Sequence, residues 1–523
     1  MISAISWIPK GVPKSEPLVA DPPSKDDVQQ FITTHASEDE DEVEADANKH
    51  SDEVAQALTV ASAIGKASAE NYDDITLALK DLDMDHYDEE DEGIELFSSG
   101  IGELYYPSNE VDPYIKDKND DDDSDELEDM IINPTDSVIV CARNEDDVSL
   151  LEVWILEDAN SSEMNMYIHH DIIIPAFPLC TAWLDCPLKE GERGLNYGFL
   201  AQYLWHAYLC CSSCLIVCFI QLSPPNPPLH ELQVIEGNFL AVGSMEPSIE
   251  IWDLDVIDEV QPCVVLGGTT EKKKKGKKKS IKYKEDSHTD SVLGLAWNKE
   301  YRNILASASA DNRVKIWDVV AGKCDITMEH HTDKVQAVAW NHHAPQVLLS
   351  GSFDHTVVLK DGRMPSHSGY KWSVTADVES LAWDPHTEHS FVVSLEDGIV
   401  KCFDIRTAQA DSTSEQCSTF TLHAHDKAVT SLSYNLSAPN LLATGSMDKT
   451  VKLWDLSNNQ PSCVASKSPK VGAVFSISFS EDNPFLLAIG GSKGKLQVWD
   501  TLSDSGISRR YENHYRNRSQ SGS

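Results

Sequence analysis

Residues 288–318 read HTDSVLGLAWNKEYRNILASASADNRVKIWD, and residues 425–455 read HDKAVTSLSYNLSAPNLLATGSMDKTVKLWD. Both stretches begin with His, continue into a short apolar segment, pass through a segment rich in small residues, and end in Trp-Asp. Turn-forming residues separate the segments, as expected for short β-strands joined by tight connections. The chain therefore contains an internal repeat, which decides its fold class.

Weaker copies of the same ending occur at Asp253, Asp361, Asp404 and Asp500. Together with the two clear copies they give successive separations of 65, 43, 43, 51 and 45 residues. Four of these five lie near the period of about 40–45 residues that a four-stranded blade of a WD-repeat propeller requires. One such sheet cannot bury both of its faces alone, whereas sheets stacked around an axis bury one another.

A seventh copy is split by a long insertion. Ser137–Val140 and Leu150–Trp154 match the second and third strands of a blade, and Ile2–Trp7 matches the first strands Val335–Trp340 and Val378–Trp383. We therefore predict an all-β, seven-bladed WD-repeat β-propeller with a disordered, partly helical acidic insert in blade one.

These matches divide the chain into predicted segments. In chain order they are the first strand of blade one (1–10), the acidic insert (11–135), the rest of blade one (136–170), blade two (171–262) with an anomalous insertion at about 195–236, a lysine-rich loop (263–287), the other five blades (288–505) and a disordered tail (506–523).

Negative charge is concentrated near the N-terminus. The formal net charge is −44, and residues 1–136 contain 38 Asp and Glu against 8 Lys and Arg. Runs such as Asp88–Glu92 and Asp120–Asp123 repel themselves and bury no apolar surface, so most of the insert is expected to be disordered. Val54, Leu58, Ala61 and Ile64 recur at helical spacing and predict one short helix within it.

The acidic insert suggests a charge-based role. Long-range attraction would favour basic partners, including histones and ribosomal proteins, although simple solubility explains the same composition. Ser37 is followed by Glu38, Asp39 and Glu40, which makes it a candidate phosphorylation site for an acid-directed kinase. Twelve scattered cysteines and the lack of a secretory signal pattern indicate a reducing compartment.

The repeated polar residues have a catalytic and a structural interpretation. His288, Ser307 and Asp311 resemble a base, a nucleophile and an orienting acid. Similar sets recur in other repeats, however, and an active site would not be copied blade by blade. We therefore predict a structural hydrogen-bond network and no enzyme activity, cofactor or metal. Its predicted members are His288, Ser307, Asp311, Trp317, His425, Thr444, Asp448 and Trp454.

Four blades depart from this pattern. Glu246 replaces the turn Asp of blade two, Lys360 and Phe403 replace the Trp of blades four and five, and Lys493-Gly494 replaces the turn Asp of blade seven. These blades are expected to lack the full network and to be softer.

Blade two carries an insertion of foreign composition at about residues 195–236. Trp183 and Ser244 are 61 residues apart, whereas the equivalent distance elsewhere is 11 or 12. Residues 199–222 are uncharged and long enough to span a membrane, but a single span would place two neighbouring strands on opposite sides of the bilayer. Zinc binding is disfavoured because Cys210, Cys211, Cys214, Cys218 and His206 lack two separated Cys-x-x-Cys pairs. Our preferred hypothesis is translated non-coding sequence.

A basic run lies between blades two and three. It comprises Lys272, Lys273, Lys274, Lys275, Lys277, Lys278 and Lys279. We interpret it as a nuclear import signal, with a nucleic-acid contact and a solvated loop as alternatives. Tyr283 is the only aromatic residue nearby, so sequence-specific RNA reading is not supported.

With these features in place, the chain resembles the periodic tryptophan protein 1 family of eukaryotic nuclear WD-repeat proteins. The resemblance covers nearly the whole chain, apart from residues 195–236. It is carried by Ile2–Gly11, Leu79–Asp91, Asn144–Ser149 with Leu151–Trp154, and Val242–Pro247 with Ile251–Asp255.

The resemblance implies a location in the nucleus, and within it in the nucleolus. It also implies a scaffold role in rRNA gene transcription and ribosome biogenesis, with a chromatin association. Implied partners are pre-ribosomal factors and histones or other basic proteins, with indirect contact to rRNA or rDNA and none with membranes. The alternative is a substrate-receptor or adaptor propeller of a ubiquitin ligase. That alternative expects Trp-Asp-x-Arg endings, which only the degenerate Phe403–Arg406 approaches.

Overall fold

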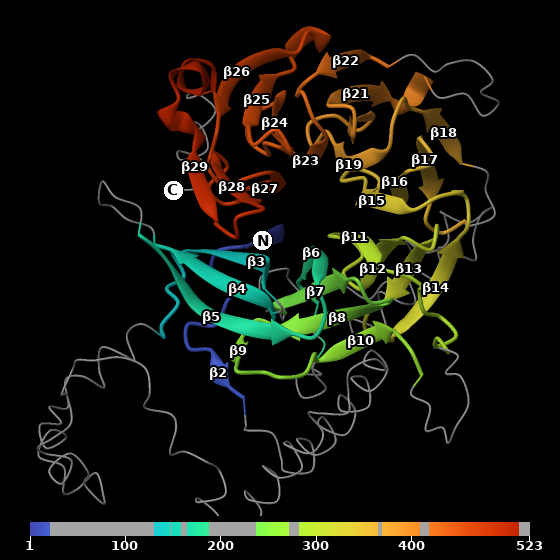
Figure 1. Ribbon diagram of the computed structural model, residues 1–523, viewed down its shortest axis with the longest axis vertical. Helices are drawn as coiled ribbons and strands as arrows, with labels where there is room; N and C mark the ends of the chain where they lie inside the picture. The colour runs from blue at the N-terminus through green and yellow to red at the C-terminus, as the bar shows by residue number, and fades with distance from the viewer. Residues whose placement is uncertain are drawn as a thin grey trace, which may run out of the picture. The chain divides into compact units, whose positions relative to one another are not determined.

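Each repeat forms one antiparallel sheet whose strands follow one another outward from the central axis (Figure 1). The computed structural model describes residues 1–20, 130–146, 148–157, 165–186, 188, 237–270, 282–364, 369–407 and 418–511. These residues belong to one compact unit. Seven of their sheets are the blades of a β-propeller, so the predicted fold class is confirmed.

The strands of the first three blades are ordered from the axis outward. Blade 1 contains β1 (Ile2–Ile8), β3 (Ser137–Glu145), β4 (Val148–Leu156) and β5 (Met166–Ile174); blade 2 contains β6 (Pro178–Leu184), β7 (Phe239–Ser244), β8 (Ser248–Asp253) and β10 (Val264–Gly267); blade 3 contains β11 (Val292–Trp297), β12 (Ile304–Ser309), β13 (Val314–Asp318) and β14 (Lys323–Met328).

The other four blades have the same order. Blade 4 contains β15 (Val335–Trp340), β16 (Val347–Ser352), β17 (Thr356–Asp361) and β18 (Tyr370–Ser373); blade 5 contains β19 (Val378–Trp383), β20 (Ser390–Leu395), β21 (Ile399–Asp404) and β22 (Phe420–His423); blade 6 contains β23 (Val429–Tyr434), β24 (Leu441–Ser446), β25 (Val451–Asp455) and β26 (Ser462–Lys467); blade 7 contains, among the described residues, β27 (Val474–Phe479), β28 (Leu486–Gly491) and β29 (Gln497–Asp500).

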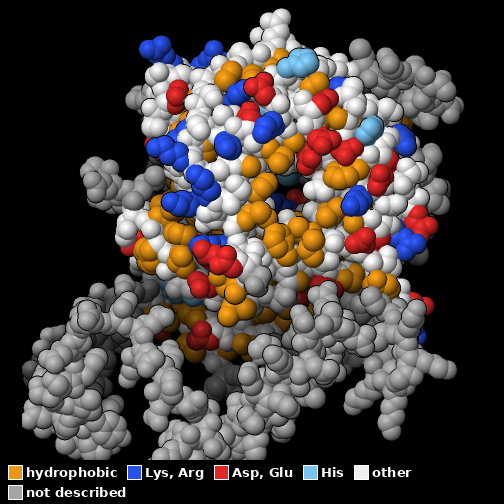
Figure 2. All heavy atoms as spheres, in the orientation of Figure 1, with side chains coloured by type: hydrophobic (Ala, Val, Ile, Leu, Met, Phe, Trp, Pro, Cys, Tyr) orange, Lys and Arg blue, Asp and Glu red, His pale blue; other side chains and the backbone are white. Residues whose placement is uncertain are grey.

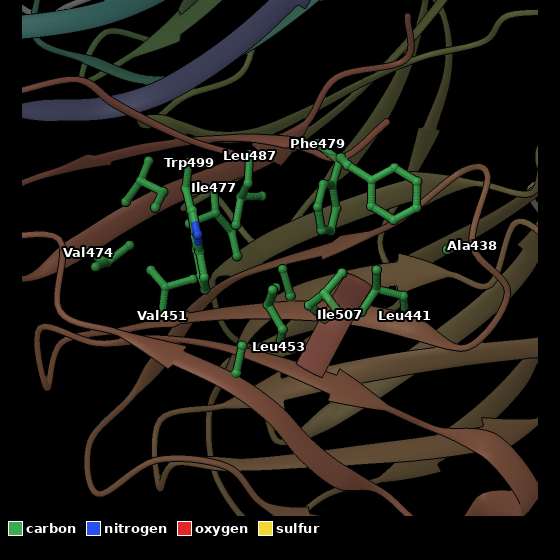
Figure 3. Close-up of a cluster of buried hydrophobic side chains, with 14 of the residues drawn as sticks. Ala438, Leu441, Val451, Leu453, Val474, Ile477, Phe479, Leu487, Trp499 and Ile507 are labelled. Atoms are coloured by element: carbon green, nitrogen blue, oxygen red, sulfur yellow. The ribbon is translucent and has the colours of Figure 1, made fainter. Parts of the chain in front are cut away.

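Buried apolar side chains between neighbouring blades form the core. In one such cluster, Val451 and Leu453 of blade 6 meet Val474, Ile477 and Trp499 of blade 7 (Figure 3). The Trp residues that end third strands are nearly fully buried in this way, because their large rings fill the space between two sheets. They are Trp252, Trp317, Trp454 and Trp499.

The N-terminal strand closes the ring. β1 pairs with β3 inside blade 1 and packs against β27 of blade 7 and β6 of blade 2. Ile2 is fully buried and lies beside Gly490 of blade 7, where even a single added carbon would collide with it. The first strand of blade 1 therefore comes from residues more than 120 positions away from the next strand, as the split repeat predicts.

The ordered chain extends further into the acidic segment than the predicted boundaries. Leu18–Val19 forms β2, which pairs in parallel with β9 (Val256–Ile257) of the blade 2 region. Ile132 is buried and its N–H donates to the Ser15 carbonyl at 2.9 Å. Both ends of the insert are thus attached to the propeller by backbone hydrogen bonds, and the predicted helix at residues 54–64 lies outside the described residues.

The predicted disordered tail also begins too early. Residues 505–511 are helical, and they follow the short 3₁₀ helix η7 (Thr501–Ser503). Ile507 and Tyr511 are buried against blade 6, and Arg510 forms an ion pair with Asp455. An apolar residue and an aromatic residue spaced four apart give this segment one buried face, so it packs rather than remaining free.

Ring closure by β1 can be tested with two separate variants that each replace one Ile of blade 1 by Ala. Ile2→Ala removes a fully buried side chain and should lower the free energy of unfolding by about 2–5 kcal/mol, measured by urea denaturation. Ile173→Ala on the outer strand of the same blade, where the side chain is 68% exposed, should change it by less than about 0.5 kcal/mol. Equal effects would contradict closure by the N-terminal strand.

Candidate functional site

In blades 3 and 6 the predicted polar residues form one continuous hydrogen-bonded chain. The Trp317 Nε1–H donates to Ser307 Oγ at 2.8 Å, Ser307 Oγ lies 2.7 Å from His288 Nε2, and His288 Nδ1 lies 2.9 Å from Asp311. Blade 6 repeats this chain with Trp454, Thr444, His425 and Asp448 at 2.9, 2.7 and 2.9 Å. The chain ties the second and third strands to the loop before the inner strand.

The electrostatics of this network suit a structural role. Burial lowers the pKa of His288, so the imidazole is neutral and its two nitrogens serve as one donor and one acceptor. Burial alone would raise the pKa of Asp311, but hydrogen bonds from His288 and from the Thr289 and Arg313 N–H groups bring it below its usual value. Because His288 and Ser307 are fully buried, no substrate reaches them, and a nucleophilic role is unsupported.

Blade 4 departs from the expectation that it lacks the network. Lys360 stands where blades 3 and 6 have Trp, but the preceding loop supplies a second imidazole. His330 Nε2 lies 2.8 Å from Ser350 Oγ, which is the position that the indole N–H occupies elsewhere, and His331 joins Ser350 to Asp354. The network is therefore complete, with His330 replacing Trp.

Blade 5 is stabilised differently, by ring packing. Phe403, which replaces the Trp, stacks on Phe391 with ring centroids 5.5 Å apart. Trp372 of β18 meets Phe391 edge-on at 5.1 Å, and all three rings are buried. Aromatic contacts of this geometry, here between blade 5 and the outer strand of blade 4, add to the energy of burial.

A second repeated interaction surrounds the central channel. Every inner strand carries an aromatic residue at or next to its end, and the indoles of several of them bond to the preceding blade. The Trp340 Nε1–H donates to the Ala296 carbonyl and that of Trp383 to the Ala339 carbonyl, each at 3.1 Å. The Trp7 Nε1–H donates to Ser478 of blade 7 at 2.9 Å, so the same link operates across the ring closure.

The two faces of the ring can be distinguished by strand direction. We call the face on which inner strands begin the entry face, and the face on which they end the exit face. On the exit face, the ends of the inner strands of blades 3–6 and the connections after them enclose a cavity of about 460 Å³. Its walls include Val338, Leu381, Leu432, Pro385 and the 38% exposed Leu436.

Charged groups border this cavity. Lys299 of blade 3 forms an ion pair with Glu481 of blade 7, although these blades are not neighbours in the ring. His342 also lines the cavity, and burial together with the nearby Lys299 lowers its pKa. A pocket whose walls combine apolar and polar side chains is suited to receive a side chain of a protein partner.

Comparison with known proteins places the chain in a family. The WD domain, G-beta repeat model matches residues 279–318, 322–361, 416–455 and 462–500. An uncharacterized WD repeat-containing protein of Schizosaccharomyces pombe is 41% identical over 76% of this chain and 68% of its own length. Periodic tryptophan protein 1 of Saccharomyces cerevisiae is 28% identical over 91% and 83%, and its Drosophila melanogaster homolog is 26% identical over 65% and 62%.

The chain belongs to the periodic tryptophan protein 1 family. The resemblance expected from the sequence is thereby confirmed, and the propeller described above is the fold that WD repeats form. The family and its fold are those of a protein-binding scaffold.

Sequence reasoning missed two features of this family member, the ion pair of Arg363 and the role of His330. Arg363 and Arg406, each two residues after the Asp that ends a third strand, hold that Asp in a two-pronged ion pair on the exit face of adjacent blades. Of these two pairs, only that of Arg406 could be recognised as a motif in the sequence. In blade 4, Lys360 replaces the Trp of the Trp-Asp ending, so the pair of Arg363 could not be recognised. The role of His330 was hidden for the same reason.

Several predicted sites lie outside the described residues. They are the import signal Lys272–Lys279, the candidate phosphorylation site Ser37, and the Cys and His residues between 206 and 218. The part of the chain that the structure describes holds no group of three or more His, Cys, Asp or Glu side chains placed to bind a metal ion. Within the same residues, no helix is both long and apolar enough to cross a membrane.

The network of blade 4 makes stability depend on pH. Burial lowers the pKa of His330 from 6.5 to about 3, so the unfolded chain binds a proton here that the folded chain rejects. The neutral His330 therefore contributes fully to the free energy of unfolding at pH values above its unfolded pKa of 6.5. The free energy of unfolding falls as the pH drops from 6.5 towards 3, by about 2 kcal/mol between pH 7 and pH 5. His330→Gln should reduce this pH dependence by that amount in urea unfolding curves. Identical pH dependence in both proteins would contradict the assignment.

Proposed function

We propose that this chain is a non-catalytic scaffold of the nucleus, and of the nucleolus in particular, that brings proteins together in ribosome biogenesis. The exit-face cavity is the observation that carries the proposal, since it offers apolar walls, an exposed Leu436 and a charged rim to a partner side chain. The buried repeated networks support a structural role for the residues that resemble a catalytic set. Family membership supplies the ribosomal context.

We further propose an association with rRNA gene chromatin. The 38 acidic residues within residues 1–136 would attract basic partners such as histones or ribosomal proteins, through an interaction that salt weakens. The scaffold would thus combine a specific docking cavity with a less specific acidic arm.

One observation favours a second candidate, an adaptor of a ubiquitin ligase. Arg363 and Arg406 present Asp–Arg pairs on the same face of two adjacent blades, and the Arg406 side chain is 68% exposed. Neither pair follows a Trp, however, so the complete Trp-Asp-x-Arg ending is missing from both blades. Recovery of a ligase complex without pre-ribosomal proteins from nuclei would favour the adaptor.

A single substitution in the cavity tests the scaffold proposal. Leu436→Asp places a charge on the exposed part of the apolar wall, where a docked partner would have to desolvate it. Affinity purification of the tagged protein from nuclei should recover pre-ribosomal proteins with wild type and at least about tenfold less with the variant, which corresponds to about 1.4 kcal/mol.

The matched control is Val320→Asp, at a 49% exposed position after the third strand of blade 3 and away from the cavity. It should recover partners as wild type does. Equal recovery with Leu436→Asp would show that the cavity is not the docking site, and absence of pre-ribosomal proteins with wild type would refute the ribosomal role.

Nuclear localisation can be tested separately. Replacing Lys272–Lys275 and Lys277–Lys279 by Ala removes seven positive charges from the candidate import signal. A fluorescent fusion of the full chain should then shift from the nucleus to the cytoplasm, as measured by the ratio of the two signals. Unchanged nuclear accumulation would remove the import assignment.

A further inference from the structure

The entry face carries a group of exposed lysines on two adjacent blades. They lie in the loops before the inner strands and between the second and third strands of blades 6 and 7. We call this group the lysine surface, and its members are Lys427, Lys449, Lys470, Lys493 and Lys495, all exposed. The surface is unexpected on a chain with a net charge of −44.

Charge is segregated between the two faces of these blades. All seven lysines of residues 425–511 belong to the entry-face loops or the strand ends beside them, the remaining two being Lys452 and Lys467. Five of the seven acidic residues of the same segment lie in exit-face connections, namely Asp455, Glu481, Asp482, Asp500 and Asp504. Of the two acidic residues on the entry face, Asp448 is hydrogen-bonded to His425 within the network of blade 6. Only Asp426 is left to offset the lysine surface.

The described ion pairs of blades 6 and 7 use other groups. Arg510 pairs with Asp455, and Glu481 pairs with Lys299, all in exit-face connections. Two half-buried lysines are also engaged: the Lys452 ammonium donates to the Ala424 carbonyl at 2.7 Å, and that of Lys467 lies 5.0 Å from the Trp499 ring centre. The five exposed ammonium groups face solvent and are available to a ligand.

Acidic residues limit the surface on both sides. Blade 5 presents Glu379, Asp377 and Glu396 on the entry face. Burial, and to a lesser extent the negative charges of Glu396 and Asp377, raises the pKa of Glu379 to about 7. Blade 1 presents Glu145 and Asp146 on its entry-face loop. Figure 2 shows this division, with Lys and Arg side chains over the sector of blades 6 and 7 and acidic side chains over blades 4 and 5.

The chemistry of the loops indicates how a ligand would be recognised. Residues 425–428, 447–450, 468–473 and 492–496 contain no Phe, Tyr, Trp or Arg. They therefore offer point charges without stacking platforms or planar guanidinium groups. Such a surface fits an extended row of phosphates and does not read bases.

Charge density distinguishes two kinds of anion that could bind here. Successive residues of an extended acidic peptide are about 3.3–3.6 Å apart. A nucleic-acid duplex carries a charge per about 1.7 Å of axis and so places more negative charge along the lysine surface. A dense polyanion is therefore favoured over an acidic peptide.

We propose that the lysine surface binds the phosphate backbone of double-helical RNA without reading its sequence. The choice of RNA over DNA rests on the proposed role in ribosome biogenesis. The scaffold would then hold proteins at the exit-face cavity and RNA on the opposite face.

The test measures binding of the full chain to a fluorescent RNA hairpin as a function of salt. Five phosphate contacts predict a slope of about −4.5 in log K against log salt, or a roughly 500-fold loss of affinity between 50 and 200 mM. Changing the five lysines to Gln should abolish most of this dependence and weaken binding at least about tenfold at low salt.

The matched control removes five exposed lysines from other parts of the chain, namely Lys14, Lys282, Lys284, Lys323 and Lys371. It has the same net charge as the surface variant and should bind RNA with the wild-type slope. Equal loss in both variants would reduce the effect to net charge and overturn the proposal. Tighter binding of a matched DNA duplex or of a poly-glutamate peptide at the same lysines would also overturn it.

The outcomes separate this inference from the proposed function. Recovery of pre-ribosomal proteins by both variants from nuclease-treated nuclei, with no RNA binding by wild type, overturns only the lysine surface. RNA binding that depends on the five lysines, without any pre-ribosomal protein recovered, supports the surface and refutes the ribosomal scaffold.

Discussion

Mutual burial between neighbouring sheets is the constraint on which the rest of this structure depends. No blade can bury both of its faces alone, so every blade needs a neighbour on each side, and the ring must close. Closure is provided by β1, which supplies the inner strand of blade 1 and packs Ile2 against blade 7 at Gly490. The indole of Trp7 adds a hydrogen bond across the same junction. The long segment between β1 and β3 is thereby held at both ends by the propeller, because its neighbouring strands are paired partners in one sheet.

The repeats made the architecture predictable, because strand spacing and the Trp-Asp endings are local in sequence. Even the split blade could be assigned, since Ile2–Trp7 matches the inner strands of other blades. Features that depend on three-dimensional neighbours were not predictable. His330 completes the network of blade 4 from a position outside the repeat pattern, and the channel indoles bond to carbonyls of the preceding blade, 44 residues away. Ile507 and Tyr511 lie in a polar tail whose packing becomes evident only when blade 6 is present.

The candidate sites differ in the same way. The network residues recur at fixed positions, so their connection could be expected from repetition alone. The exit-face cavity is formed by four inner strands and the connections after them, which are about 40–50 residues apart in sequence. The lysine surface likewise combines four loops in which no local lysine run occurs. The conspicuous run at Lys272–Lys279 drew attention in the sequence, whereas Lys427, Lys449 and their neighbours are unremarkable until the ring brings them together.

The same closure explains why this propeller accepts long insertions. Residues 185–238 separate β6 from β7, yet Trp183 still pairs with Leu240, and its indole N–H donates to Asn238 at 3.1 Å. The entropy of closing a loop grows only with the logarithm of its length, so extending a connection from about 6 to about 50 residues costs about 2 kcal/mol. Cross-strand pairing and burial against two neighbouring blades offset a cost of this size. The pairing of β6 with β7 therefore completes blade 2 although the connection between these two strands is long.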